Sequence, residues 1–192
     1  MHNLTPIRDI SFEELFDEWR KNEAKNPDWI HCATDVKGWP DWESWRRNTL
    51  SLFGAEKRQW KIYSIDDQME FIPKMLMGPF NGWQAKVPEH NKYSFEEMLA
   101  LPENLEFYSH HGKVLDMIKN FPAQALFTGV IREKLGKVVC IEGHHRATAI
   151  SLAKVLYQKI EFGQKLHIAL TTISEDEDGI FDYMQEIGTS KR

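Results

Sequence analysis

The sequence contains little cysteine, no long apolar run and no large excess of charge of one sign. Its two cysteines, Cys32 and Cys140, are too few for a disulfide framework or a cysteine-rich metal centre. The apolar runs are too short to cross a bilayer, and residues 1–10 lack the layout of a signal peptide, so we expect a cytoplasmic protein with no membrane contact. A net charge of −5 disfavours binding to duplex DNA.

Familiar catalytic and metal-binding signatures are also missing. The chain has no G-x-S-x-G elbow, no Walker P-loop and no G-x-G-x-x-G fingerprint. The sequence therefore does not indicate a serine hydrolase, a P-loop NTPase or a Rossmann dehydrogenase. Histidines occur as adjacent pairs at 110–111 and 144–145. Neighbouring residues on a helix point about 100° apart, so we expect no metal site from either pair.

The aromatic residues that are present are unevenly distributed. All seven tryptophans lie within the first 83 of the 192 residues. A chain of this length suits one compact domain, and its 42% hydrophobic content is enough to form a core. We therefore expect a single unit, made of a tryptophan-rich helical extension over residues 1–58 and a core over residues 59–192.

Periodicity and capping signals predict an α+β fold. Ser11 and Glu14 form a capping box that predicts a helix to about residue 25. Further helices are expected over residues 39–54, 66–75, 94–101, 112–120, 144–157 and 174–187, and strands over residues 59–65, 125–131, 137–141 and 165–173.

The most informative segment is the junction between the strand that begins at residue 137 and the helix that follows it. The strand ends at Glu142, the chain turns at Gly143, and the helix opens with His144, His145 and Arg146. Free N–H groups in a first helical turn and a forked guanidinium both suit a phosphate or another anion. The alternative is an ordinary tight turn followed by a solvated helical turn.

The order of elements around this motif resembles the ParB/sulfiredoxin-like superfamily. A helix, a break at Asn120-Phe121-Pro122, two strands, the Glu-Gly-His-His-Arg string, an alanine-rich helix and a strand follow one another over residues 112–173. The string is similar to the DGHHR form of the free serine kinase branch. This resemblance implies a small mixed sheet with packed helices, and a site for ATP or ADP with Mg²⁺ at Gly143, His144, His145 and Arg146.

Other branches of the superfamily fit less well. Sulfiredoxins carry a cysteine where this chain has His144, and Cys140 lies earlier, within the strand. Sulfinic-acid reduction is therefore disfavoured. Only some 45 residues follow the motif, which leaves little room for the helical DNA-binding domain of the chromosome-partitioning branch.

The kinase branch implies a phosphotransferase acting on a small hydroxyl-bearing substrate. Glu142 takes the place of the aspartate that serves as base there. A second acid is expected from an earlier loop. Our first candidate for it is Glu89, and our second is Glu70.

Three alternatives remain open. Glu142 can be a structural carboxylate paired with an arginine. The protein can be a non-catalytic sensor of a nucleotide or another anionic metabolite, or an adaptor that binds partner proteins through its aromatic half.

Most tryptophans are expected to pack in the core, but Trp83 belongs to a Gly-Pro-Phe-Asn-Gly-Trp segment that predicts a loop. A large ring in such a loop can stack on a base or sugar. We therefore expect Trp83, with Phe80 and Asn81, to contribute to ligand binding.

Overall fold

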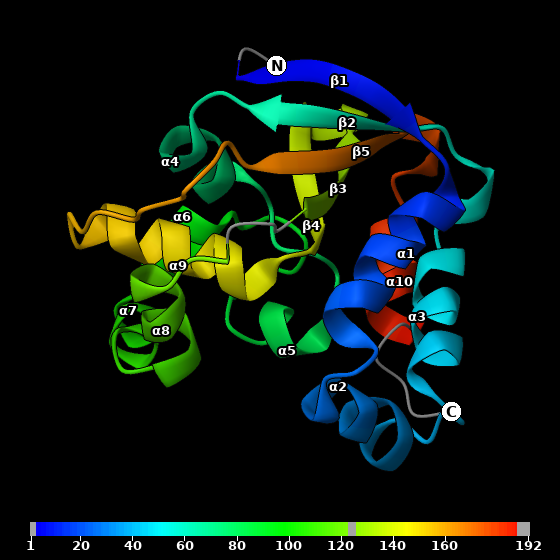
Figure 1. The fold of residues 1–192 in the computed structure, drawn as a ribbon, viewed down its shortest axis with the longest axis horizontal. Coiled ribbons are helices and arrows are strands. Elements are labelled where there is room, and N and C mark those ends of the chain that lie inside the picture. Colours follow the sequence, from blue (N-terminus) through cyan, green and yellow to red (C-terminus); the bar gives the residue numbers. More distant parts are fainter. Residues whose placement is uncertain (1–2, 123–125, 188–192) are drawn as a thin grey trace.

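The computed structural model describes residues 3–122 and 126–187, which form an α+β fold built on one five-stranded mixed sheet. The sheet crosses the upper part of the molecule in Figure 1, and the helices lie below it and on both sides. Its strands are β1 (Leu4–Ile10), β2 (Trp60–Ile65), β3 (Leu126–Arg132), β4 (Lys137–Glu142) and β5 (His167–Ile173).

The strand order β1-β2-β5-β3-β4 places the motif-bearing strand β4 at one edge of the sheet. The β3–β5 pair is parallel, and the other neighbouring strands are antiparallel. β3 and β4 form a hairpin whose register shifts between Thr128 and Gly129. This shift lies opposite the end of β4, at the position where the chain turns into the next helix.

The helices are α1 (Phe12–Glu23), α2 (Pro27–His31), α3 (Trp42–Ser51), α4 (Gln68–Phe71), α5 (Asn81–Gln84), α6 (Phe95–Leu99), α7 (Pro102–Ser109), α8 (Gly112–Lys119), α9 (His144–Val155) and α10 (Ile180–Ile187).

Side chains alternate across β4, as the period of a strand requires. Val138 and Cys140 join the core cluster that includes α6, α8 and α9, whereas Val139 and Ile141 join the cluster that includes α1, α3 and α10.

The N-terminal extension is less helical than the sequence predicts. Residues 4–10 form the edge strand β1, which pairs with β2. Five consecutive residues of β1 are exposed, so the segment has no apolar alternation from which a strand could be predicted. The rest of the extension packs on the sheet, because Phe16, Trp42 and Phe53 share one core cluster with Val130 and Ala169.

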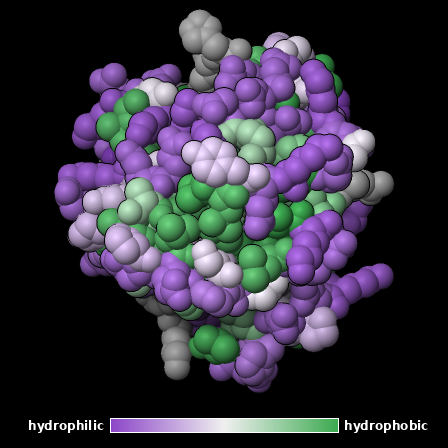
Figure 2. All heavy atoms as spheres, turned by 90° about the vertical axis from the view of Figure 1, so that its left-hand side faces the viewer, coloured by the Kyte–Doolittle hydropathy of each residue, from purple (hydrophilic) through white to green (hydrophobic). Residues whose placement is uncertain are grey.

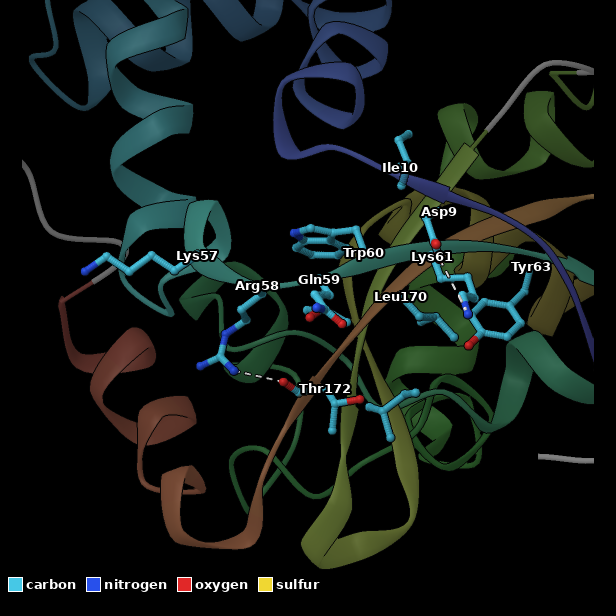
Figure 3. Close-up of a pocket in the computed structure, with 12 residues that line it drawn as sticks. Asp9, Ile10, Lys57, Arg58, Gln59, Trp60, Lys61, Tyr63, Leu170 and Thr172 are labelled. Carbon is cyan, nitrogen blue, oxygen red and sulfur yellow. Dashed lines mark hydrogen bonds and ion pairs between the residues drawn. The ribbon is translucent and has the colours of Figure 1, made fainter.

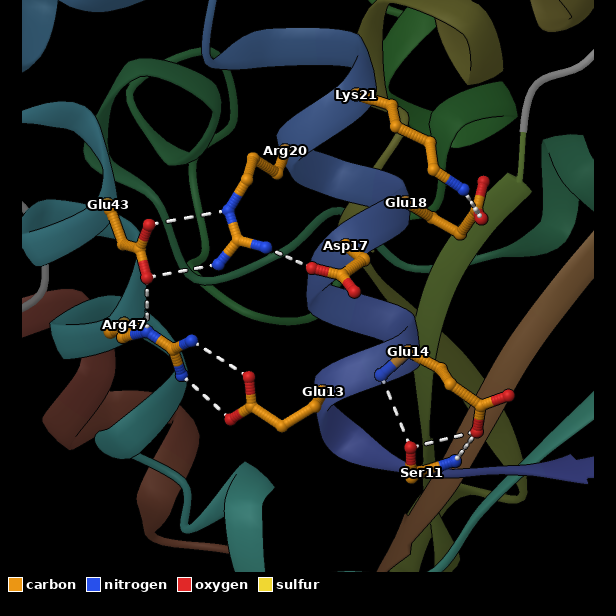
Figure 4. Close-up of polar contacts among 9 residues, drawn as sticks. All are labelled: Ser11, Glu13, Glu14, Asp17, Glu18, Arg20, Lys21, Glu43 and Arg47. Atoms are coloured by element: carbon orange, nitrogen blue, oxygen red, sulfur yellow. Dashed lines mark hydrogen bonds and ion pairs between the residues drawn. The ribbon is translucent and has the colours of Figure 1, made fainter.

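Ion pairs between α1 and α3 hold the extension together (Figure 4). Arg47 of α3 bonds to Glu13 of α1 and to Glu43, and Glu43 also binds Arg20 of α1. The helix predicted from Ser11 is confirmed. The Ser11 side chain accepts a hydrogen bond from the backbone N–H of Glu14, and this bond completes the capping box.

Most of the other predicted elements are also present. The strand predicted from residue 125 is found from Leu126, and residue 125 itself lies outside the described residues. Asp41 caps α3, so Pro40 precedes the helix and does not occupy its first turn. The short helices α2 and α7 were not expected, because neither segment has a clear apolar face.

One face of the molecule has an apolar centre (Figure 2). It is the side on which α7, α8 and the C-terminal end of α9 lie, and polar side chains border the apolar ones. Val155, Leu156 and Tyr157, at the end of α9, are exposed. Within the described residues, no helix has both the length and the apolar character needed to cross a membrane.

Candidate functional site

The turn between β4 and α9 is built around Gly143. Its φ of +110° is accessible to glycine and strained for other residues, and a Cβ at this position would lie 2.5 Å from the ring of Phe127. Gly143 is the N-cap residue and has no side chain, so the first turn of α9 has no side-chain cap among the described residues. The N–H groups of this turn therefore remain available to a ligand.

Glu142 and Arg146 form an ion pair across this turn. The guanidinium of Arg146 also donates through Nη2 to the carbonyl of Leu126, at 3.1 Å, and lies 4.6 Å from the centre of the Phe127 ring. Burial raises the pKa of the Glu142 carboxyl, and the charge of Arg146 opposes that rise. Glu142 is therefore a carboxylate with a greater than usual affinity for a proton.

His144 is placed inside the core and not at the surface of the turn. Its Nε2 accepts the backbone N–H of Gly78 at 2.9 Å, and its ring stacks on Trp83 with centroids 5.0 Å apart. Burial lowers the pKa of His144 to about 3, so the imidazole is neutral at pH 7. His144 holds the loop of Gly78 against α9, and we leave it out of the set of direct phosphate contacts.

His145 points instead toward the N-terminus of α8. Its ring centroid lies 5.9 Å from that of His111, the residue that precedes α8. Burial, together with the positive charge of Lys113 and the neighbouring His111, lowers the pKa of His145 to about 4. The Nδ1 atom of His111 is buried and has no hydrogen-bond partner among the described residues. The N-termini of α8 and α9 therefore lie side by side.

These two helix ends are unusual in their charge. Among the described helices of eight residues or more, α1, α3, α7 and α10 carry an acid in the first turn, whereas α8 and α9 carry none. Their first turns hold the cations Lys113 and Arg146 and the neutral His145, so two cations lie at the positive ends of the helix dipoles. Glu142 precedes the turn and offsets part of this charge. The remaining positive potential favours an anion.

Trp83 lies beside this site, but other rings cover it. It belongs to the single-turn helix α5, where the sequence predicted a loop. Its ring is parallel to that of Tyr108, with an interplanar angle of 4°, and it also stacks on His144. The ring of His145 forms an edge-to-face pair with it, with centroids 5.2 Å apart. The ring of Trp83 therefore packs against both histidines of the motif, His144 and His145, and holds them in place.

The structure does not bring Glu89 to the junction. Glu89 is exposed and pairs with Lys92 at 2.6 Å, and no described contact joins it to Glu142. Glu70, the reserve candidate, pairs with Lys74 and Lys154. An acid that does act on Glu142 is Glu23, at the end of α1, whose negative charge contributes to the raised pKa of Glu142. Sequence reasoning missed Glu23, which no motif marks.

Glu23 belongs to a buried ion pair enclosed by tryptophans. Its carboxylate binds Arg46 of α3 at 2.7 Å, and the indole N–H of Trp42 donates to it. The guanidinium of Arg46 lies 4.4 Å from the Trp45 ring and 4.6 Å from the Trp29 ring. Arg46 also lowers the pKa of Glu142, so the extension acts on the motif electrostatically.

An open hollow lies on the sheet away from this junction (Figure 3). This cavity of about 750 Å³ is open to solvent and is lined by Asp9, Lys61 and Tyr63 from β1 and β2 and by Thr172 from β5. Its basic side chains are largely paired: Lys61 with Asp9, and Arg58 with Glu177 and the carbonyl of Thr172. None of the residues that the sequence predicts as functional lines this cavity.

The described residues contain no cluster of three or more histidine, cysteine or acidic side chains suited to hold a metal ion. Magnesium in nucleotide sites is bound mainly through phosphates and water, with one or two carboxylates, and Glu142 provides one carboxylate. Comparison with known proteins finds no match to the chain among protein-family models, curated proteins or solved structures.

Proposed function

We propose that the protein binds the phosphates of a nucleotide at the adjoining N-termini of α8 and α9 and transfers a phosphoryl group to a small hydroxyl-bearing molecule. The observation that carries this proposal is the meeting of two helix N-termini whose first turns hold Lys113, His145 and Arg146 and no acid. Such an arrangement favours an anion, because Glu142 pairs with Arg146 and offsets only part of the positive potential at the two helix ends.

Each of these groups has a suitable part in phosphate binding. Arg146 uses Nη2 for its described hydrogen bonds, so its Nη1 and Nε are available for phosphate oxygens. Lys113 is exposed and can turn toward the same anion. The neutral ring of His145 can donate one N–H, and the backbone N–H groups of the first turn of α9 supply further donors.

Glu142 is suited to act as the base. In the transfer, the acceptor oxygen forms a bond to the terminal phosphorus, the bond to the bridging oxygen breaks, and the shortened nucleotide leaves. The proton of the acceptor hydroxyl passes to Glu142, whose raised pKa favours that transfer. Mg²⁺ bound with the nucleotide supplies charge neutralisation at the phosphates.

The order of elements gives further support. A helix, a strand, a strand that ends in Glu-Gly-His-His-Arg, a helix and a strand correspond to α8, β3, β4, α9 and β5. This is the order on which the resemblance to the ParB/sulfiredoxin-like superfamily rests. We therefore retain a nucleotide-dependent phosphotransferase activity toward a small hydroxyl-bearing substrate, as in the kinase branch of that superfamily, as the leading function.

The proposal is tested by incubating the full-length protein with labelled ATP or ADP, Mg²⁺ and a pool of small alcohols and hydroxy amino acids. We expect label transfer that Glu142→Gln abolishes while nucleotide binding is retained. The control is Glu89→Gln, whose carboxylate lies outside the site; it leaves transfer unchanged. Nucleotide binding that persists unaltered in Arg146→Ala contradicts the proposed site.

A non-catalytic sensor is the second candidate, and the Glu142–Arg146 ion pair favours it. Arg146 holds the Glu142 carboxylate and also faces the proposed ligand. Glu142 can therefore have a structural role and take no part in proton transfer. This candidate predicts saturable binding of ATP or ADP, weakened by Arg146→Ala, without transfer to any acceptor. Glu142→Gln would then change binding and stability but no rate.

A further inference from the structure

Trp29 on α2 differs from the buried tryptophans of the extension. Trp19, Trp42 and Trp45 are at most 8% exposed, whereas Trp29 is half-buried. Its ring packs against Trp45, with centroids 6.0 Å apart, and against the guanidinium of Arg46. The helix that carries it has no buried residue, and Trp29 packs from it against the apolar cluster that includes Phe16 and Trp45.

Trp29 also reaches the phosphate site of the core. The ammonium of Lys113, from the first turn of α8, lies 5.7 Å from the centre of the Trp29 ring. The same lysine acts on His145, the first-turn residue of α9, as its effect on the pKa of that histidine indicates. An aromatic ring of the extension therefore lies next to the two helix ends at which we place the phosphates.

The other ring near the site, Trp83, is also half-buried but has more aromatic neighbours. Its ring stacks on both Tyr108 and His144 and forms edge-to-face pairs with Phe95 and His145. At Trp29, by contrast, one of the contacts is a flexible and exposed lysine. A cation of this kind can leave the ring for a phosphate, and a flat base can take its place, because both interactions use the π-face of the indole.

We propose that Trp29 is the specificity-determining residue of the site: it stacks on the aromatic base of the nucleotide whose phosphates lie at the N-termini of α8 and α9. Lys113 then turns from the Trp29 ring to the phosphates. The inference rests on the proposed nucleotide binding. It assigns base recognition to the extension and phosphate recognition to the core, and it replaces the sequence-based expectation that Trp83 contacts the base.

The test compares two ligands, ADP and inorganic pyrophosphate, which share the diphosphate but differ in the base and sugar. Their dissociation constants are measured by calorimetry with the full-length protein, Trp29→Ala and Trp29→Phe. We expect Trp29→Ala to weaken ADP binding at least about fivefold, the lower end for loss of one stacking contact, and to leave pyrophosphate binding within twofold. Trp29→Phe keeps a smaller ring and should lose less ADP affinity than Trp29→Ala.

The control is Tyr157→Ala, which removes an exposed aromatic ring at the opposite end of α9 and should change neither constant. Equal weakening of ADP and pyrophosphate in the Trp29 variants, or no change in either, overturns the inference and leaves the phosphate site standing. If the parent protein binds neither ligand, the proposed function fails and this inference fails with it. Should Trp29→Ala not fold, Trp29→Phe decides: weaker ADP binding at constant pyrophosphate binding supports the inference, and any other pattern overturns it.

Discussion

At Gly143, a single missing methyl group determines the geometry of the candidate site. The backbone has a positive φ, and the space that a Cβ would fill is occupied by Phe127. Any larger residue must move either the β3 ring or the first turn of α9. The motif glycine is therefore required by the packing of the turn, whatever ligand the turn binds.

Gly143→Ala should lower the free energy of unfolding by about 2 kcal/mol, because the strained φ and the collision with Phe127 add. Urea denaturation measures this change. Gly82→Ala is the matched control: its Cβ meets no atom within 4 Å and its φ is not positive, so stability should stay equal or rise slightly. An equally small effect at both positions would contradict the assigned packing.

His144 gives the protein a predictable response to acid. Its folded pKa of about 3 lies below the unfolded value near 6.5, so the unfolded chain takes up a proton that the folded chain refuses. The stability that this imidazole contributes is complete above pH 6.5 and is lost as the pH falls toward 3. Between pH 7 and pH 5 the loss from this group should be about 2 kcal/mol.

The measurement is the free energy of unfolding at pH 7 and pH 5 for the parent and for His144→Gln, which keeps an acceptor for the Gly78 N–H. The difference between the two pH values should be about 2 kcal/mol smaller in the variant. Parallel pH profiles for the two proteins would show that His144 titrates normally and is not held in the core.

Among the elements, α9 ends in a motif that usually carries glycine. The N–H of Gln158 bonds to the carbonyl of Ala153, and the N–H of Tyr157 to that of Lys154, which is the Schellman pattern. Tyr157 occupies the left-handed position, with a φ of +53°, and is 97% exposed. Tyr157 is thus a bulky residue in a strained backbone conformation, and its exposed side chain makes no packing contact that offsets the strain.

Tyr157→Gly should therefore raise the free energy of unfolding by about 1 kcal/mol, because relief of the left-handed strain exceeds the added entropy of the unfolded chain. Chemical denaturation of the two proteins checks this. A variant less stable than the parent would mean that the tyrosine ring contributes contacts that its exposure does not indicate.

The elements also differ in how well they could be predicted from the sequence. Ser11 with Glu14 marks α1 because capping is a local interaction, and the β4–α9 junction follows from an apolar run, a glycine and an alanine-rich helix. β1 could not be predicted, since its exposed residues leave no pattern. The environment of Glu142 could not be predicted either, because Glu23 and Arg46 reach it only through the packing of distant segments.

At the scale of the whole molecule, the extension and the core share one hydrophobic cluster. The indole N–H of Trp19 in α1 donates to the hydroxyl of Thr128 in β3, at 2.9 Å, and both groups are buried. Phe16 and Trp42 pack in the cluster that also contains Val139 and Ile141. The apolar packing of the extension is thus continuous with the interior of the sheet.

This continuity predicts one cooperative unfolding transition. Tryptophan fluorescence reports on residues 1–83, which contain every tryptophan, whereas far-ultraviolet circular dichroism reports on the whole chain. The two signals should give the same urea midpoint. A fluorescence transition that precedes the loss of circular dichroism would show instead that the extension unfolds independently of the core.

The central claim is that a phosphate lies at the N-termini of α8 and α9, and backbone amide NMR tests it most directly. ADP with Mg²⁺ is titrated into the ¹⁵N-labelled full-length protein. The account predicts the largest shifts at the amides of His145, Arg146 and Lys113, which point to the bound anion. The account would be contradicted if those amides stayed in place while the largest shifts fell on the lining of the cavity near Lys61, or if no amide moved.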